Sequence, residues 1–245
     1  MKMIVEIIST GKELLVGEVV NTNAVWIAKR LTLKGFTVRR IIVVGDSIEE
    51  ISSALEESMK RANLIILTGG LGPTSDDVTR EAVAQVLKRK LVLSKEVFDY
   101  ILRERKCGLK ATEKMSYVIE GCYIIFNKVG SAPGMIIEHD SKIVVCLPGP
   151  PHELKSMFPE VEKYLEKYSA EKLYEERIRV SGLPEISVFE KIYSIAKKYP
   201  KIYFKTRVLN SGEVEIYLLG KESDIAKASN EIRELLKGYI KSSPS

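Results

Sequence analysis

The stretch from Leu64 to Ala82, LIILTGGLGPTSDDVTREA, decides the fold of this chain. Its apolar start is typical of a buried parallel strand, and the three glycines that follow, Gly69, Gly70 and Gly72, predict a tight turn. The residues after Ser75 have helical periodicity. A strand, a glycine turn and a helix start in this order predict a phosphate-sized pocket, because glycines and the first helical turn both offer backbone N–H groups to an anion.

Two adjacent carboxylates, Asp76 and Asp77, follow the glycines. They would repel a phosphate bound at the loop, and a divalent cation that bridges carboxylate and phosphate oxygens removes this conflict. The alternative is that Asp76 caps the helix and that Asp77 complements the helix dipole. The loop is neither a Walker A loop nor a full dinucleotide fingerprint, since no Gly-Lys-Ser/Thr follows and Ser75 stands where the third glycine would be.

The elements around this stretch predict an α/β fold. Residues 3–9 and 36–45 read as further buried strands, and each precedes a helical pattern. Three β-α units in succession are typical of an open, mostly parallel sheet with helices on both faces. The later patterns predict helices at 94–108, 111–118 and 152–168, and strands at 123–126, 135–138 and 143–147.

After residue 170 the pattern restarts as a small α+β domain. A strand, a helix, a hairpin across Asn210-Ser211-Gly212 and a final helix follow in the order β-α-β-β-α. We therefore expect two domains, residues 1–170 with the pocket and residues 171–245 without a catalytic-looking cluster. We interpret the second as a packing or dimerisation module.

Composition narrows the classes of function. The 245 residues carry a net charge of +5 without a basic tract, which suits an anionic small molecule as well as nucleic acid. Only 7% of the residues are aromatic, which disfavours a nucleic acid whose bases stack on rows of rings, so we do not expect nucleic acid as the partner. Three cysteines without C-x-x-C spacing indicate neither a zinc site nor disulfides. The first residues read as a strand and not as a signal peptide, and no run approaches the ~18 apolar residues of a membrane span. We predict a cytoplasmic protein that does not enter the membrane.

Five motifs together resemble the CinA-like proteins, whose first domain is similar to the molybdopterin-binding fold of MogA and MoaB. The motifs are TGKELLVGEVVNTNA (10–24), VVGD (43–46), TGGLGPTSDDVTREA (68–82), GSAPGM (130–135) and LPGPPHEL (147–154). The resemblance is strong up to about Tyr168, and RVSGLPE (179–185) with the tail is similar to the second domain of that family. Longer members add a nicotinamide-nucleotide deamidase domain, an activity that we expect to be absent because this chain ends at Ser245.

Two stretches depart from the family pattern. Residues 111–119, ATEKMSYVI, differ from the family at the base- or sugar-facing part of the pocket. Ser131 stands where threonine is usual, which keeps the hydroxyl. The phosphate side of the pocket matches the family.

The resemblance implies metal-dependent hydrolysis of the pyrophosphate in ADP-ribose or a related dinucleotide, with Mg²⁺, Mn²⁺ or Co²⁺ as the cofactor. Asp76, Asp77 and Glu13 are then the catalytic candidates, and Asp46, Asp76 and Asp77 the candidate metal ligands at the carboxyl edge of the sheet. The ligand-binding candidates are Gly69, Gly70, Gly72, Thr74, Lys12, Asn23, Gly134, Pro148 and Gly149.

Two alternatives stay open, because function depends on the site and not on the fold. One is a molybdopterin-binding protein or an adenylyltransferase that acts on molybdopterin. The other is a regulator that binds a nucleotide and hydrolyses nothing. In each case the partner is a small nucleotide or pterin, and the resemblance implies a homodimer.

Overall fold

The computed structural model describes residues 3–105, 107–169 and 171–240, which form two compact units. The first unit holds the described residues within 1–32 and 36–170, and the second those within 33–35 and 171–245. Among these residues, none of the helices has both the length and the apolar character that a bilayer span requires.

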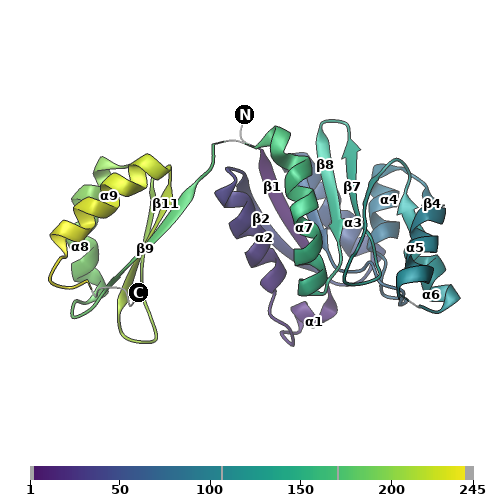
Figure 1. Ribbon diagram of the computed structural model, residues 1–245, viewed down its shortest axis with the longest axis horizontal. Helices are drawn as coiled ribbons and strands as arrows, with labels where there is room; N and C mark the ends of the chain where they lie inside the picture. Colours follow the sequence, from purple (N-terminus) through teal and green to yellow (C-terminus); the bar gives the residue numbers. More distant parts are fainter. Residues whose placement is uncertain (1–2, 106, 170, 241–245) are drawn as a thin grey trace. The chain divides into compact units, whose positions relative to one another are not determined.

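A six-stranded sheet forms the centre of the first unit (Figure 1). β1 pairs in parallel with β2 and β3, β3 pairs in parallel with β8, and the antiparallel strands β7 and β6 complete the order β2-β1-β3-β8-β7-β6. The strands are β1 (Ile4–Thr10), β2 (Thr37–Val44), β3 (Leu64–Thr68), β6 (Tyr123–Ile125), β7 (Gly134–His139) and β8 (Lys142–Leu147). The mostly parallel sheet expected from the sequence is confirmed.

Helices cover both faces of this sheet because successive strand residues point to opposite sides. Ile7 packs in the core that includes α2 (Thr22–Leu33) and α7 (Pro151–Leu165), which continues into a 3-10 turn at Glu166–Tyr168. Its neighbour Ile8 packs in the other core. The helices on that second face are α3 (Ile48–Arg61), α4 (Thr79–Leu87), α5 (Lys95–Arg105) and α6 (Leu109–Ser116).

A two-stranded antiparallel sheet of β4 (Leu91–Leu93) and β5 (Tyr117–Ile119) was not expected. The helix predicted over 111–118 ends at Ser116, and Val118 and Ile119 enter the core as strand residues. Two β-branched residues in succession favour extended backbone, and their burial against neighbouring helices outweighs the helical pattern before them.

The second unit has the β-α-β-β-α order that the sequence predicts. Its strands form one antiparallel sheet in the order β10-β11-β9. The elements are β9 (Tyr174–Val180), α8 (Glu185–Lys198), β10 (Tyr203–Val208), β11 (Val214–Gly220) and α9 (Glu222–Leu235). A separate hydrophobic core that includes Val180, Ile216 and Ile232 holds this unit together.

Candidate functional site

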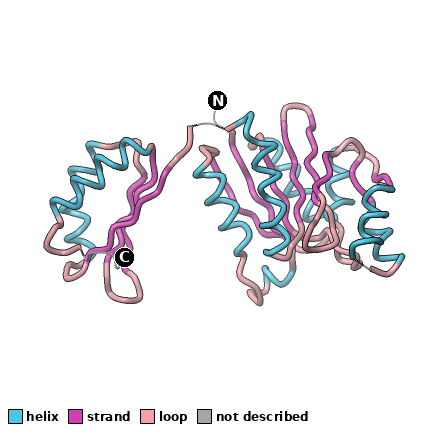
Figure 2. Tube along the Cα trace, viewed as in Figure 1, coloured by secondary structure: helices cyan, strands magenta, loops and turns pink. Residues whose placement is uncertain are grey.

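A cavity of about 490 Å³ lies at the carboxyl edge of the parallel strands. This volume is within the range of small-molecule sites. Loops of the first unit gather at this edge (Figure 2). The loops after β1, β2, β3 and β8 form one part of its wall, and α6, the loop 126–133 and the first turn of α7 form the rest. Predicted site residues that line it are Glu13, Asp46, Gly69, Gly70, Gly72, Asp76, Asp77, Pro148 and Gly149.

The glycine loop has a backbone conformation that other residues rarely adopt. The φ angles of Gly69 and Gly70 are 101° and 64°, and a Cβ atom on Gly69 would lie 2.5 Å from the carbonyl oxygen of Thr10. The Gly69 N–H donates to Leu147 O over 3.0 Å and is therefore not free for a ligand, contrary to expectation. Among the described residues, nothing accepts a hydrogen bond from the N–H groups of residues 70–72.

The start of α4 holds this loop from behind. The Thr79 hydroxyl donates to Gly69 O over 2.9 Å, and the Thr79 N–H donates to Gly70 O over 3.1 Å. The Arg80 guanidinium donates to Leu71 O over 2.6 Å and to Gly72 O over 3.0 Å. Arg80 was not predicted as a site residue, although a charged residue on the apolar stripe of a helix is a signal that the sequence contains.

The acidic pair does not begin the helix. α4 begins at Thr79, and Val78 in the N-cap position makes no side-chain cap. The alternative in which Asp76 caps the helix is therefore wrong, and the first helical N–H is not free for an anion. Asp77 Oδ2 instead accepts from the N–H of Thr74 over 2.9 Å and from its hydroxyl over 2.6 Å, which closes the turn before the helix.

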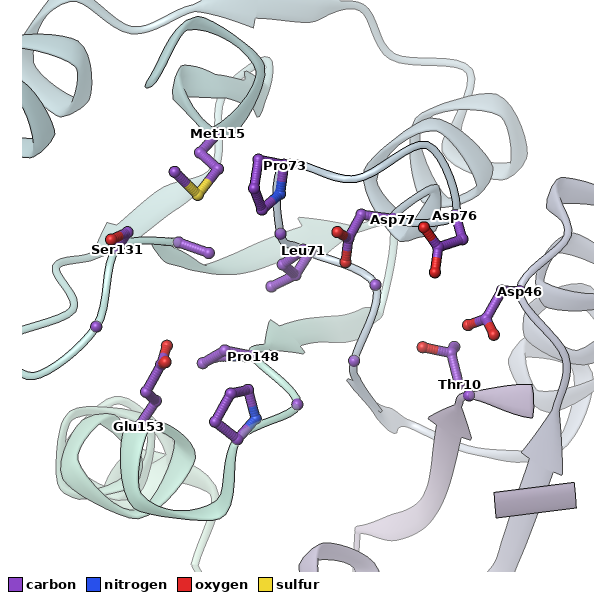
Figure 3. A pocket seen from close by; sticks show the side chains of 18 of the residues that line it. Thr10, Asp46, Leu71, Pro73, Asp76, Asp77, Met115, Ser131, Pro148 and Glu153 are labelled. Atoms are coloured by element: carbon purple, nitrogen blue, oxygen red, sulfur yellow. The ribbon is translucent and has the colours of Figure 1, made fainter. Parts of the chain in front are cut away.

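Three aspartates lie on one side of the pocket, as Figure 3 shows for Asp46, Asp76 and Asp77. Asp46 Oδ2 accepts a hydrogen bond of 2.8 Å from the backbone N–H of Lys12. Hydrogen bonding by the Thr74 hydroxyl, then by the Asp76 amide, and the charge of Lys114 hold the pKa of Asp76 below its ordinary value. Asp76 is therefore negatively charged at neutral pH.

The described carboxylates do not form a complete metal cage. No group of three or more His, Cys, Asp or Glu residues among them is placed to hold a metal ion. Mg²⁺ is usually bound by one or two carboxylates together with phosphate oxygens and waters. Asp46 and Asp76 extend their carboxylates into the same side of the pocket (Figure 3), so the residues fit an ion whose coordination is completed by a bound phosphate.

Four predicted ligand contacts lie outside the lining of this cavity. The side chain of Lys12 is exposed, and the Thr74 hydroxyl bonds to Asp77. Asn23 lines a neighbouring cavity of about 110 Å³ and donates to Gly149 O over 2.7 Å. Gly134 is a packing residue, because a Cβ atom there would lie 3.1 Å from Cys146 O.

The half of the pocket away from the aspartates includes Ala111 and Met115 of the stretch 111–119, which the resemblance places at the base- or sugar-facing part, but Glu153 was not predicted as a site residue. Its wall is mostly apolar and includes Leu71, Pro73, Ala111, Met115 and Ala132, with Glu153 as its carboxylate. Glu153 lies in the LPGPPHEL motif, and the buried Asn127 that contacts it precedes the GSAPGM motif. Both motifs are evident in the sequence, but the contact between them depends on the fold.

Residues 6–167 match the family described as "Probable molybdopterin binding domain". A CinA-like protein of Kosmotoga olearia is 40% identical over 96% of this chain and 60% of its own length. A CinA-like protein of Thermosipho melanesiensis is 36% identical over 96% of this chain and 59% of its own length. The crystal structure of CinA from Thermoplasma acidophilum is 35% identical with a TM-score of 0.63, over 66% of this chain and 98% of that one. The chain thus spans about three fifths of the length of these curated relatives.

Proposed function

The chain belongs to the molybdopterin binding domain family and is CinA-like, and from this premise we propose that its pocket binds the phosphate of a pterin or nucleotide. The observation that carries the proposal is the glycine loop. The N–H groups of residues 70–72 donate to no acceptor among the described residues, and these residues line the pocket. Successive free N–H groups in a turn form an anion-binding concavity.

The charges around the loop support the same proposal. The buried guanidinium of Arg80 is bonded to the carbonyl oxygens of Leu71 and Gly72. Its positive charge acts through the protein interior, where screening by water is weak, and therefore favours an anion at the loop. Asp46 and Asp76 would hold a divalent ion that neutralises the repulsion between phosphate and carboxylates.

A second candidate is hydrolysis of the pyrophosphate in ADP-ribose or a related dinucleotide. It is favoured by the four carboxylates at the phosphate end, Glu13, Asp46, Asp76 and Asp77. A bound divalent ion supplies polarisation of a phosphoryl oxygen. Glu13 is exposed and lines the pocket, so it is the residue that we propose accepts a proton from the attacking water.

One experiment separates these functions. The wild-type protein and Asp76→Asn are each incubated with ADP-ribose, NADH, FAD or ATP in the presence of Mg²⁺, Mn²⁺ or Co²⁺. The reaction products are separated by chromatography. Binding of the same compounds is measured by calorimetry. AMP and ribose 5-phosphate from ADP-ribose, lost in the variant, support the hydrolase. Binding without turnover supports a binding protein. The proposal is contradicted if the protein neither hydrolyses nor binds any of these compounds and also does not bind a pterin phosphate.

A further inference from the structure

The three-stranded sheet of the second unit has one face without helices. Successive residues of a strand point to opposite faces of its sheet. Ile178, Ile216 and Leu218 pack in the core with α8 and α9, and both helices lie on that side of the sheet (Figure 1). Among the described residues of this unit, no helix covers the other face. The strand register places three rows of side chains on it, which we call the open face: Tyr203-Leu219-Glu175, Lys205-Tyr217-Arg177 and Arg207-Glu215-Arg179.

The open face is basic, because four of its side chains are cationic and two are carboxylates. Glu215 is buried and accepts from Arg177 Nη1 over 3.1 Å and from Arg207 Nε over 2.9 Å. This one carboxylate therefore holds two guanidinium groups in place. Arg179 and Lys205 are exposed, and neither has a carboxylate partner among the described residues. Their charges are available to a polyanion.

Two tyrosines lie next to these charges. The rings of Tyr203 and Tyr217 meet edge to face, with their centroids 6.3 Å apart. The Arg177 guanidinium lies over the Tyr217 ring, 4.9 Å from its centroid, and the Tyr217 hydroxyl donates to Glu175 Oε2 over 3.0 Å. Tyr217 is thus fixed by its neighbours and supports the ring of Tyr203, which is 56% exposed. An exposed tyrosine ring is a surface on which an unpaired base stacks.

We propose that the open face binds single-stranded nucleic acid, with a base stacked on Tyr203 and backbone phosphates at Lys205 and Arg179. Successive rows are roughly 7 Å apart, since each step covers two residues of a strand, so the ring and the cations reach neighbouring nucleotides. An acidic peptide matches the charges alone, whereas nucleic acid matches both the charges and the exposed ring.

This proposal departs from the expectation that we drew from the aromatic content of the whole chain. That content does not reveal the open face, because only the pairing of β10 with β11 brings the two tyrosines together. The open face belongs to the second unit, so the proposal does not depend on the phosphate site of the first unit.

The test measures binding of labelled oligonucleotides of about 12 nucleotides to the full chain by fluorescence anisotropy. Oligothymidine and oligouridine are the probes, and the tighter one identifies DNA or RNA as the source of the strand. Each titration is repeated with an excess of ADP-ribose, and we expect the same affinity because the open face is separate from the pocket. A duplex of the same length is expected to bind at least about fivefold more weakly, because its bases are already stacked on one another.

Two variants test the residues themselves. Tyr203→Ala is expected to weaken binding of the single strand at least about fivefold through the loss of one stacked base. Lys205→Glu is expected to weaken it at least about tenfold at low salt, because a phosphate then faces a negative charge. Both side chains are exposed, so the melting temperatures should not change.

Each variant has a matched control in the same unit. Tyr174 is an exposed tyrosine of β9, and its register opposite Gly220 places it on the face with the helices. Lys227 is an exposed lysine of α9. Tyr174→Ala and Lys227→Glu are expected to bind the oligonucleotides as the wild type does, and losses equal to those of Tyr203→Ala and Lys205→Glu would overturn the role of the open face.

The wild-type measurements decide the matter even if a variant fails to fold. Absence of binding, or equal binding of single strand and duplex, overturns the proposal. Competition by polyglutamate as strong as that by unlabelled oligonucleotide also overturns it and indicates an acidic peptide as the partner. Displacement of the oligonucleotide by ADP-ribose would place the binding in the pocket of the first unit, which equally contradicts the role of the open face.

Discussion

The guanidinium of Arg80 donates a hydrogen bond of 2.6 Å to the carbonyl oxygen of Leu71, inside the protein and directly behind the pocket wall. A second bond of 3.0 Å reaches Gly72 O. Burial lowers the pKa of Arg80, which shows that the charge is costly at this position. The bonds to the loop offset that cost and hold the loop residues that we propose bind phosphate.

Arg80→Met is expected to destabilise the protein and to weaken phosphate binding. The substitution leaves two carbonyl oxygens without their donor, which costs about 2 kcal/mol of unfolding free energy. Urea denaturation gives the stability, and calorimetry with ADP-ribose gives the affinity. Arg103→Met is the control, because Arg103 is 72% exposed and its pair with Glu104 contributes little. Equal effects of the two substitutions would contradict the structural role of Arg80.

Gly69→Ala is expected to be more harmful than Gly212→Ala. Both glycines have positive φ, 101° and 79°, but a Cβ on Gly69 meets Thr10 O at 2.5 Å and one on Gly212 meets nothing within 4 Å. The conformational cost, about 1–2 kcal/mol, applies to both. Thermal melting is expected to show an additional loss of at least about 1 kcal/mol for Gly69→Ala, with loss of ADP-ribose binding. Similar melting temperatures would refute the steric explanation.

Asp76→Asn and Asp77→Ala are expected to separate ligand binding from loop stability. Asp76 is exposed, so its change should lower Mg²⁺-dependent binding of ADP-ribose at least about tenfold without shifting the melting temperature. Asp77 accepts both bonds from Thr74, so its loss should cost about 1 kcal/mol of stability. The pKa of Asp76 is depressed below 3.8, so its carboxylate stays charged down to about pH 5. The difference in Mg²⁺-dependent ADP-ribose binding between the wild type and Asp76→Asn should therefore be the same at pH 7 and at about pH 5.

Glu6 is expected to make stability depend on pH below its ordinary pKa. It is fully buried in β1, and its carboxylate accepts from Ser58 Oγ over 2.8 Å and from Arg61 Nη2 over 3.0 Å. Burial alone would raise its pKa, but hydrogen bonds from Arg61 and Ser58 and the charges of Arg61 and Arg40 hold it below 4.5. The stabilisation is therefore complete above pH 4.5 and is lost as the pH falls through the lower folded-state pKa.

The measurement is the unfolding free energy in urea at several pH values. Glu6→Gln is expected to be about 3 kcal/mol less stable at pH 7, because a buried pair loses one partner. Its stability should then fall less steeply between pH 5 and pH 3 than that of the wild type. Parallel curves for the two proteins would show that Glu6 does not carry this dependence.

The sequence predicts the fold well where local signals and burial agree. The apolar runs of β1, β3 and β8 are examples, and the serine before α3 is another, because Ser47 Oγ accepts from the Glu50 N–H over 3.2 Å as an N-cap. β4 and β5 were not predicted, because a strand of three residues has too short a pattern to be recognised in the sequence. Each of the two strands is stabilised by pairing with the other and by packing on the core.

The site is only partly predictable, because its residues meet through the sheet and not through the chain. The aspartates and the glycine loop end neighbouring strands, so the β-α pattern suffices to bring them together. Asn127 and Glu153 are 26 residues apart in sequence, and their hydrogen bond requires the antiparallel return of β7 beside β8. Arg80 donates to the carbonyl oxygens of Leu71 and Gly72 from the protein interior, and no motif in the sequence indicates that its side chain points toward the glycine loop.

The pairing of β3 with β8 also determines when the pocket can form during protein synthesis. Gly69 N–H bonds to Leu147 O, so the glycine loop lacks one of its anchors until the chain has been made past residue 147. Until then β3 has an unpaired edge, which is a place where strands of other chains can add. The glycine loop therefore acquires its full set of backbone anchors only after the last strand of the first unit's sheet has been synthesised.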